Sequence, residues 1–133
     1  MRTDMMENQV TTVETSKQLI GMGVPSIKAS LWWERVHGSL DWGLKFNDDL
    51  QLDDSVETIP AFTTYELMTL LPSYIEDEGM TLEMSCFRYG ESWAVSYYSQ
   101  EHNYGLTYIC YDLIGALYLA VAGLVNKGYK LNL

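Results

Sequence analysis

The chain contains 133 residues, with 18 acidic and eight basic side chains and a formal net charge of −10 at pH 7. Its hydrophobic share of 47% is typical of a globular protein and excludes a disordered chain. A field this negative repels nucleic-acid phosphates and anionic lipid headgroups, which disfavours direct binding to DNA, RNA or a membrane surface.

The first predicted element is a short helix within TTVETSKQLIGMG. Residues 1–10 before it are polar, lack the apolar core of a signal peptide and are expected to be flexible. Thr11 and Glu14 have the spacing of a capping box, in which two side chains satisfy backbone N–H groups of the first turn. Gly21 and Gly23 predict the end of this helix, because glycine readily adopts the left-handed conformation that stops a helix.

Two strands are predicted next, within residues 29–46. The segment ASLWWERV is rich in aromatic and β-branched side chains, which favour strands. After Gly38, four apolar residues alternate with small or polar ones, a period of two that indicates a second strand with one apolar face: Leu40, Trp42, Leu44 and Phe46. We expect a hairpin that turns near residues 37–39.

Residues 47–58, NDDLQLDDSVET, are expected to form an acidic surface loop. The carboxylates do not match the spacing of a calcium-binding EF-hand loop, which needs oxygen ligands at alternate positions around a central glycine. The pattern therefore predicts a solvated loop and no specific metal site.

The segment IPAFTTYELMTLLP carries a strong helix signal. Thr63 and Glu66 form a capping box, and Phe62 and Leu67 are placed to pack across it as a hydrophobic staple. Pro72 lacks the N–H group that a helix needs and disfavours helical geometry in the residue before it. A helix of two or three turns is predicted from Thr64 towards Leu71.

A β-hairpin is predicted over MTLEMSCFRYGESWAVSYYS, residues 80–99. Apolar and polar side chains alternate on both sides of Gly90-Glu91, which suits a two-residue turn with glycine first. Loop residues 101–105 follow.

The uncharged stretch LIGALYLAVAGLV, residues 113–125, is predicted to be a buried helix. Its 13 residues are fewer than the roughly 20 needed to span a bilayer. We expect this helix to begin near residues 107–110 and to end near Lys127, with Gly128 as a left-handed cap. The elements together predict one α+β domain over residues 1–133, with a small antiparallel sheet, the buried C-terminal helix and two shorter helices.

Few residues indicate catalytic chemistry. Cys86 and Cys110 form no CxxC pair, and His37 and His102 form no metal-ligand spacing. Cys110, at the expected helix start, is the better candidate for a reactive thiol. We predict no catalytic, cofactor-binding or metal-binding residue, no cofactor, and a reducing, cytoplasmic environment for the two thiols. A small enzyme whose site is not recognised remains a third alternative.

The aromatic side chains indicate an interaction surface. Neighbouring residues of a strand point to opposite faces, so one member of the pair Trp32 and Trp33, and of Tyr97 and Tyr98, must point away from a core on the other face. Exposed Trp and Tyr are typical anchors of protein interfaces. The predicted surface consists of Trp32, Trp33, Trp42, Trp93, Tyr97 and Tyr98. A protein partner or self-association into a homo-oligomer is favoured; a small-molecule pocket and pure core packing are alternatives.

Three motifs add a resemblance: TSKQLIGMGVPS, IPAFTTYELMTLLPSYI and the late NKGY. In this order the chain resembles small uncharacterised open reading frames of phage and mobile elements in Bacteroides-like bacteria. The resemblance implies a cytoplasmic accessory role and no catalytic residue. We therefore expect a non-enzymatic protein-interaction domain; the alternative is an acidic DNA mimic that inhibits a basic host protein, for which the −10 charge is the motivation.

Overall fold

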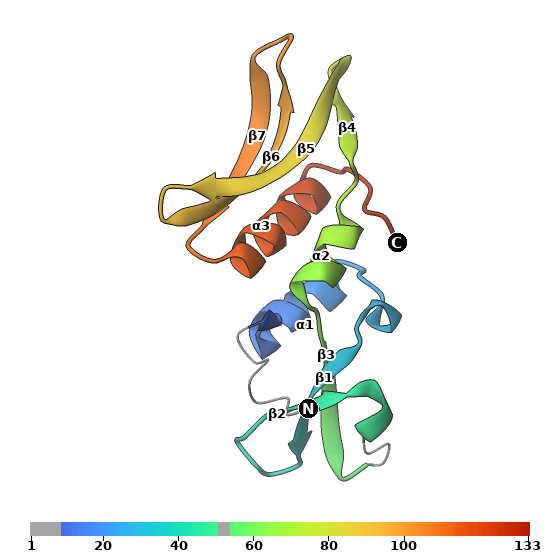
Figure 1. Cartoon of the computed structure of the whole chain (residues 1–133). Helices are drawn as coiled ribbons and strands as arrows, with labels where there is room; N and C mark the ends of the chain where they lie inside the picture. Colours follow the sequence, from blue (N-terminus) through green and yellow to red (C-terminus); the bar gives the residue numbers. More distant parts are fainter. Residues whose placement is uncertain (1–8, 51–53) are drawn as a thin grey trace. The chain divides into compact units, whose positions relative to one another are not determined.

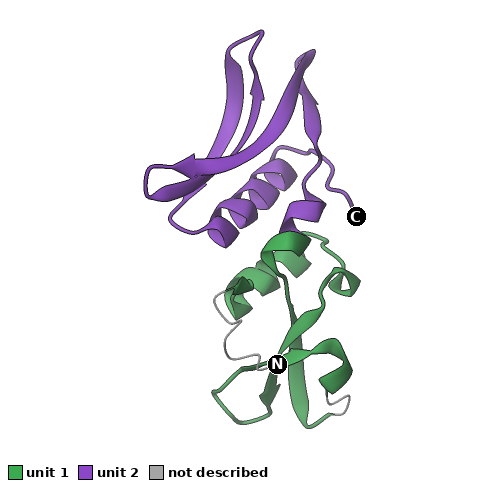
Figure 2. Cartoon of the chain, viewed as in Figure 1, with its two compact units in different colours: residues 1–66 green, residues 67–133 purple. Residues whose placement is uncertain are grey.

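The computed structural model describes residues 9–50 and 54–133, and the chain divides into two compact units, Met1–Glu66 and Leu67–Leu133 (Figures 1 and 2). Two antiparallel sheets and three α-helices confirm the predicted α+β class. Whether the units form one domain, as the sequence predicts, stays a prediction. Within the described ranges, no helix is both long and apolar enough to cross a membrane.

The first unit is a three-stranded sheet with one α-helix beside it. Its elements are α1 (Val13–Gly21), η2 (Ser26–Lys28), β1 (Leu31–Val36), β2 (Gly43–Phe46), η3 (Asn47–Asp49) and β3 (Val56–Ala61), with strand order β2-β1-β3. The start of β3 shortens the predicted acidic loop 47–58, of which residues 51–53 lie outside the described residues. The prediction for residues 1–10 falls largely on 1–8, also outside them, while Val10 is buried and bridges to Thr63.

Thr12, rather than the predicted Thr11, caps α1. The Thr12 side chain accepts a hydrogen bond from the Thr15 backbone N–H. Thr11 is instead buried, where its hydroxyl accepts from the Phe62 N–H and hydrogen-bonds with the Ser16 hydroxyl. The Trp33 indole N–H donates to the Thr11 carbonyl at 2.8 Å. Because the Thr11 hydroxyl is engaged by Phe62 and Ser16, the capping hydrogen bond is made by Thr12.

The β1–β2 connection is longer than predicted. Leu40 was expected on the apolar face of the second strand but lies in the loop and is 90% exposed, because β2 begins only at Gly43. The apolar alternation holds from there, since Leu44 is buried in a cluster with Val10, Leu31, Trp33 and Ala61.

The capping box predicted for the second helix is confirmed. Helix α2 spans Thr64–Leu70. The Thr63 N–H donates to the Glu66 carboxylate at 3.0 Å, and the Glu66 N–H donates to the Thr63 hydroxyl at 3.2 Å. The same carboxylate accepts the Ser30 N–H at 3.0 Å, so that one side chain ties this helix start to the segment before β1.

The second unit is a four-stranded antiparallel meander with α3 on one face. Its strands are β4 (Tyr74–Asp77), β5 (Met80–Tyr89), β6 (Ser92–Ser99) and β7 (Tyr104–Cys110), in that order across the sheet. The predicted β5–β6 hairpin is confirmed, with Gly90 at φ +64° in its turn. Strand β4 was not predicted; it is joined to β5 by Glu78 and Gly79, which both have positive φ.

Helix α3 (Leu113–Asn126) begins later than predicted. Residues 107–110 belong to β7, and Asp112 caps the helix by accepting the Gly115 N–H at 2.8 Å. The carboxylate of Asp112, directly before the uncharged stretch 113–125, therefore marks the start of the helix. Gly128 has the predicted left-handed conformation after the helix end, with φ +85°.

Helix α3 covers the sheet face to which the even-numbered residues of β5 and β7 and the odd-numbered residues of β6 point. Gly123 lets the Tyr108 ring of β7 lie against the helix, because a Cβ atom there would collide with that ring. Leu82, Val95 and Tyr97 are fully buried on this face. The Tyr97 hydroxyl donates to the Pro72 carbonyl at 2.7 Å, and burial raises its pKa.

Candidate functional site

The opposite face of the β4–β7 sheet, here called the open face, is the candidate site. Five large side chains on it are 40–61% exposed: Tyr74, Phe87, Tyr89, Tyr98 and Ile109. The strand register places its side chains in rows that run across the sheet. The open face consists of Tyr74, Glu76, Thr81, Glu83, Ser85, Phe87, Tyr89, Ala94, Ser96, Tyr98, Thr107 and Ile109.

The first row is aromatic and acidic. Glu83 on β5 is paired with Tyr74 on β4 and with Tyr98 on β6, so that the acidic position lies between two tyrosine positions. Side chains directly opposite each other on antiparallel strands have Cβ atoms about 5 Å apart. Beyond Tyr98 the row ends at Gly105, where a Cβ atom would collide with the Tyr97 carbonyl oxygen and with the Tyr98 ring.

The next two rows change from polar to apolar. Ser85, Ser96 and Thr107 form a row of hydroxyls, in which Ser96 and Thr107 hydrogen-bond at 3.4 Å. Phe87, Ala94 and Ile109 form the apolar row. The small Ala94 is fully buried between its two large, partly exposed neighbours. Along the strands, the open face therefore passes from carboxylate through hydroxyl to hydrocarbon.

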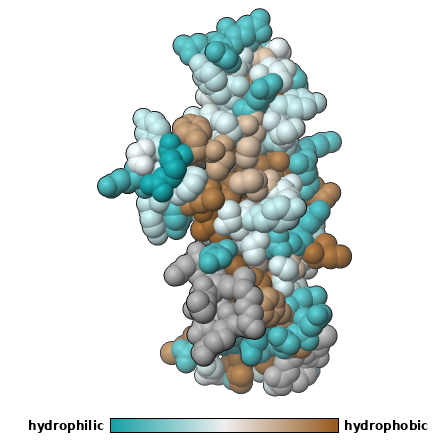
Figure 3. All heavy atoms as spheres, viewed as in Figure 1, coloured by the Kyte–Doolittle hydropathy of each residue, from teal (hydrophilic) through white to brown (hydrophobic). Residues whose placement is uncertain are grey.

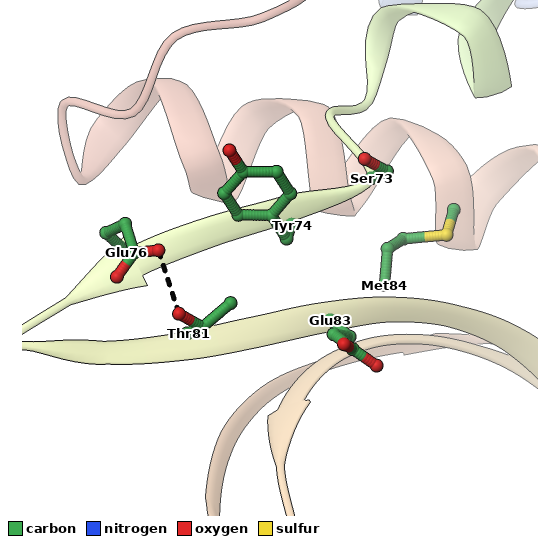
Figure 4. A pocket seen from close by; sticks show the side chains of 6 residues that line it. All are labelled: Ser73, Tyr74, Glu76, Thr81, Glu83 and Met84. Carbon is green, nitrogen blue, oxygen red and sulfur yellow. Dashed lines mark hydrogen bonds between the residues drawn. The ribbon is translucent and has the colours of Figure 1, made fainter.

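Two adjoining hollows lie along the first row. One, of about 540 Å³, is lined in part by Tyr74, Glu76 and Glu83. The other, of about 450 Å³, is lined in part by Glu83, Ser85 and Tyr98. Figure 4 shows Glu83 and Met84 leaving β5 in opposite directions, and Thr81 joined to Glu76 by a hydrogen bond of 2.8 Å. Glu83 thus borders both hollows.

The charge of the open face is negative. It holds Glu76 and Glu83 and no Lys, Arg or His. Arg88 belongs to the other face, where its guanidinium lies 5.2 Å from the centre of the Trp93 ring. Hydrophilic side chains also crowd the turns at the ends of the sheet (teal at the top of Figure 3). A partner that carries positive charge would meet no repulsion from the side chains of the open face.

The six aromatic residues predicted from the sequence are divided between the two units and differ in exposure. Tyr98 lies on the open face, whereas Trp33 and Tyr97 are buried and cannot act as surface anchors in this fold. Trp42 stacks under the Arg35 guanidinium at 4.5 Å and Trp93 under that of Arg88. Trp32 is partly buried. The sequence reasoning missed Tyr74, Phe87, Tyr89 and Ile109, although period-two alternation along β5 could have found Phe87 and Tyr89.

A second polar cluster lies in the first unit, on paired strands β1 and β3. Arg35 donates to both carboxylate oxygens of Glu57, at 2.8 and 2.9 Å, and His37 Nδ1 is 3.4 Å from the same carboxylate. The hydrogen bond from Arg35, with its charge and that of His37, lowers the pKa of Glu57. The charges of Arg35 and Glu57 are paired with each other, so this cluster links β1 to β3.

The two thiols and His102 of the second unit are not brought together, although the Cys110 thiol donates to the Asp112 carboxylate at 3.8 Å. Cys86 and Cys110 are free thiols on β5 and β7 with β6 between them, which separates them by roughly 10 Å. His102 precedes β7 and Cys110 ends it, about 20 Å apart at the rise of a strand. Burial raises the pKa of the Cys86 thiol and makes it less reactive. The described ranges hold no group of three or more His, Cys, Asp or Glu residues placed to bind a metal ion.

Comparison with known proteins adds no assignment to this geometry. No protein-family model matches the chain, and no curated protein or solved structure is significantly similar to it. The resemblance to phage and mobile-element reading frames therefore stays a prediction.

Proposed function

We propose that this chain is a non-enzymatic accessory protein that binds a protein partner through the open face. The apolar row carries the proposal, because Phe87 and Ile109 present large exposed apolar side chains on either side of a small buried residue. Exposed apolar side chains that lie together often mark protein-interaction sites, and aromatic residues are common among interface anchors. The polar rows beside them supply the hydrogen-bonding rim that such interfaces have.

The setting of this role is part of the same proposal. The motif resemblance supports an accessory function in a phage or other mobile element, and two free thiols support action in the cytoplasm. A second copy of the chain is the other occupant that the sequence left open. The DNA-mimic alternative gains no support from the described acids, since exposed carboxylates occur on α1, η3, β4, β5 and several turns.

Affinity capture with matched variants tests the proposal. The tagged chain, expressed in the cells that carry its gene, is compared with Phe87→Asp, which places a charge in the apolar row. Leu40→Asp is the control, because Leu40 is even more exposed but lies in the first unit. Circular dichroism checks that both variants remain folded.

The outcome is decided by mass spectrometry and light scattering. We expect proteins retained by the wild type and by Leu40→Asp to be lost with Phe87→Asp. A light-scattering mass of two chains that falls to one chain in Phe87→Asp would identify a second copy as the occupant. Equal capture by all three proteins, with a single-chain mass, would contradict a binding role for this face.

A further inference from the structure

The first row of the open face has the composition of a site for a positively charged side chain. A carboxylate attracts an ammonium or guanidinium group by charge, and the faces of aromatic rings attract it through their negative π-clouds. In this row Glu83 supplies the carboxylate, and the register places Tyr74 and Tyr98 at the paired positions on its two sides. The Tyr98 ring lies over Gly105, and its hydroxyl donates to Asn103. The strand register, rather than a flexible loop, holds the three together.

The Glu83 carboxylate is available for such a contact. It is exposed, and no hydrogen bond or ion pair engages it among residues 9–50 and 54–133. It borders both hollows, so a side chain could approach it from the Tyr74 side or the Tyr98 side. Glu76, which lines the first hollow, is already hydrogen-bonded to Thr81 and adds a second negative charge nearby.

We infer that the partner presents an arginine or lysine side chain, which is bound on Glu83 between Tyr74 and Tyr98. This inference rests on the proposed function and specifies the chemistry of its partner: a protein segment that carries a basic residue and an apolar residue. On the open face, the hydroxyl row separates Glu83 from the apolar row that contains Phe87 and Ile109. The absence of any basic residue from the open face makes the charges complementary.

Peptide titration followed by NMR tests the inference directly. The probe is the blocked peptide acetyl-Gly-Arg-Gly-Arg-Gly-amide, and the matched control replaces both arginines with the neutral isostere citrulline. We expect saturable amide shifts centred on Tyr74, Glu83 and Tyr98 with the arginine peptide alone. Glu83→Gln should weaken binding about fivefold or more, as expected for loss of a charge-assisted contact beside aromatic rings.

A second acidic position separates a specific site from general attraction by the negative chain. Glu91→Gln removes an equal charge at the β5–β6 turn and should change the affinity less than twofold. Equal losses in Glu83→Gln and Glu91→Gln, equal binding of the citrulline peptide, or no shifts at the first row would overturn the inference. If the inference fails while capture still depends on Phe87, the partner is apolar rather than basic and the proposed function stands.

Discussion

Two neighbouring tyrosines provide a direct test of the two-faced sheet. Tyr97 is fully buried on the α3 side and donates to the Pro72 carbonyl at 2.7 Å, whereas Tyr98 lies on the open face and donates to the Asn103 side chain. Tyr97→Phe leaves a carbonyl in a half-buried position without its partner, which costs about 1–2 kcal/mol. Tyr98→Phe leaves a side-chain oxygen that water can reach, so its cost is expected within about 0.5 kcal/mol.

The two variants are compared by urea unfolding at pH 7 and by thermal unfolding. For 133 residues the unfolding entropy is about 0.28 kcal/mol per kelvin, so Tyr97→Phe should lower Tm by roughly 4–7 °C. Tyr98→Phe should lower it by about 2 °C or less. Equal losses in the two variants would show that both hydroxyls lie in similar surroundings, and the assignment of one covered and one open face would be wrong.

Two further predictions concern a helix cap and the response to high pH. Thr63→Ala removes the hydroxyl that accepts the Glu66 N–H and should cost about 1 kcal/mol in urea unfolding, whereas Thr64→Ala, one residue later, should cost under about 0.5 kcal/mol; equal costs would contradict the cap. Burial and the hydrogen bond to Asp77 raise the pKa of Tyr129 from 10.0 to about 12. The unfolded chain then loses this proton first, so stability present below pH 10 is lost as the pH rises towards 12. Urea midpoints at pH 9, 10 and 11 should fall more steeply for the wild type than for Tyr129→Phe, and parallel curves would refute the assignment.

Local signals were sufficient to predict several elements from the sequence. The Thr63–Glu66 box and the Gly90-Glu91 turn each lie within a few residues, where propensity and hydrogen bonding act without help from the rest of the fold. The buried face of α3 was likewise readable from its uncharged run. The prediction of a cap at Thr11 was wrong, because its hydroxyl hydrogen-bonds to Ser16 and to the N–H of the distant Phe62.

Strands β3, β4 and β7 were missed for a different reason. Strand β4 has only four residues, and β7 runs almost directly into the apolar helix, so neither has a separate periodic pattern. These strands are defined by hydrogen bonds to neighbouring strands, and such pairing cannot be recognised from the sequence of one segment alone. The open face could not be predicted for the same reason, since its first row brings together Tyr74 and Tyr98, which are 24 positions apart in the sequence.

The register of β5 links correct folding to binding. A slip of one residue in this strand would exchange its two faces, turning Met84 and Cys86 outward and pressing Glu83 and Ser85 against α3. Burying that carboxylate in an apolar layer would be strongly unfavourable, so the misfolded sheet would be penalised by the same side chain to which the cation site is assigned. The charge of Glu83 therefore disfavours the slipped register, and Glu83→Gln is expected to disfavour it less.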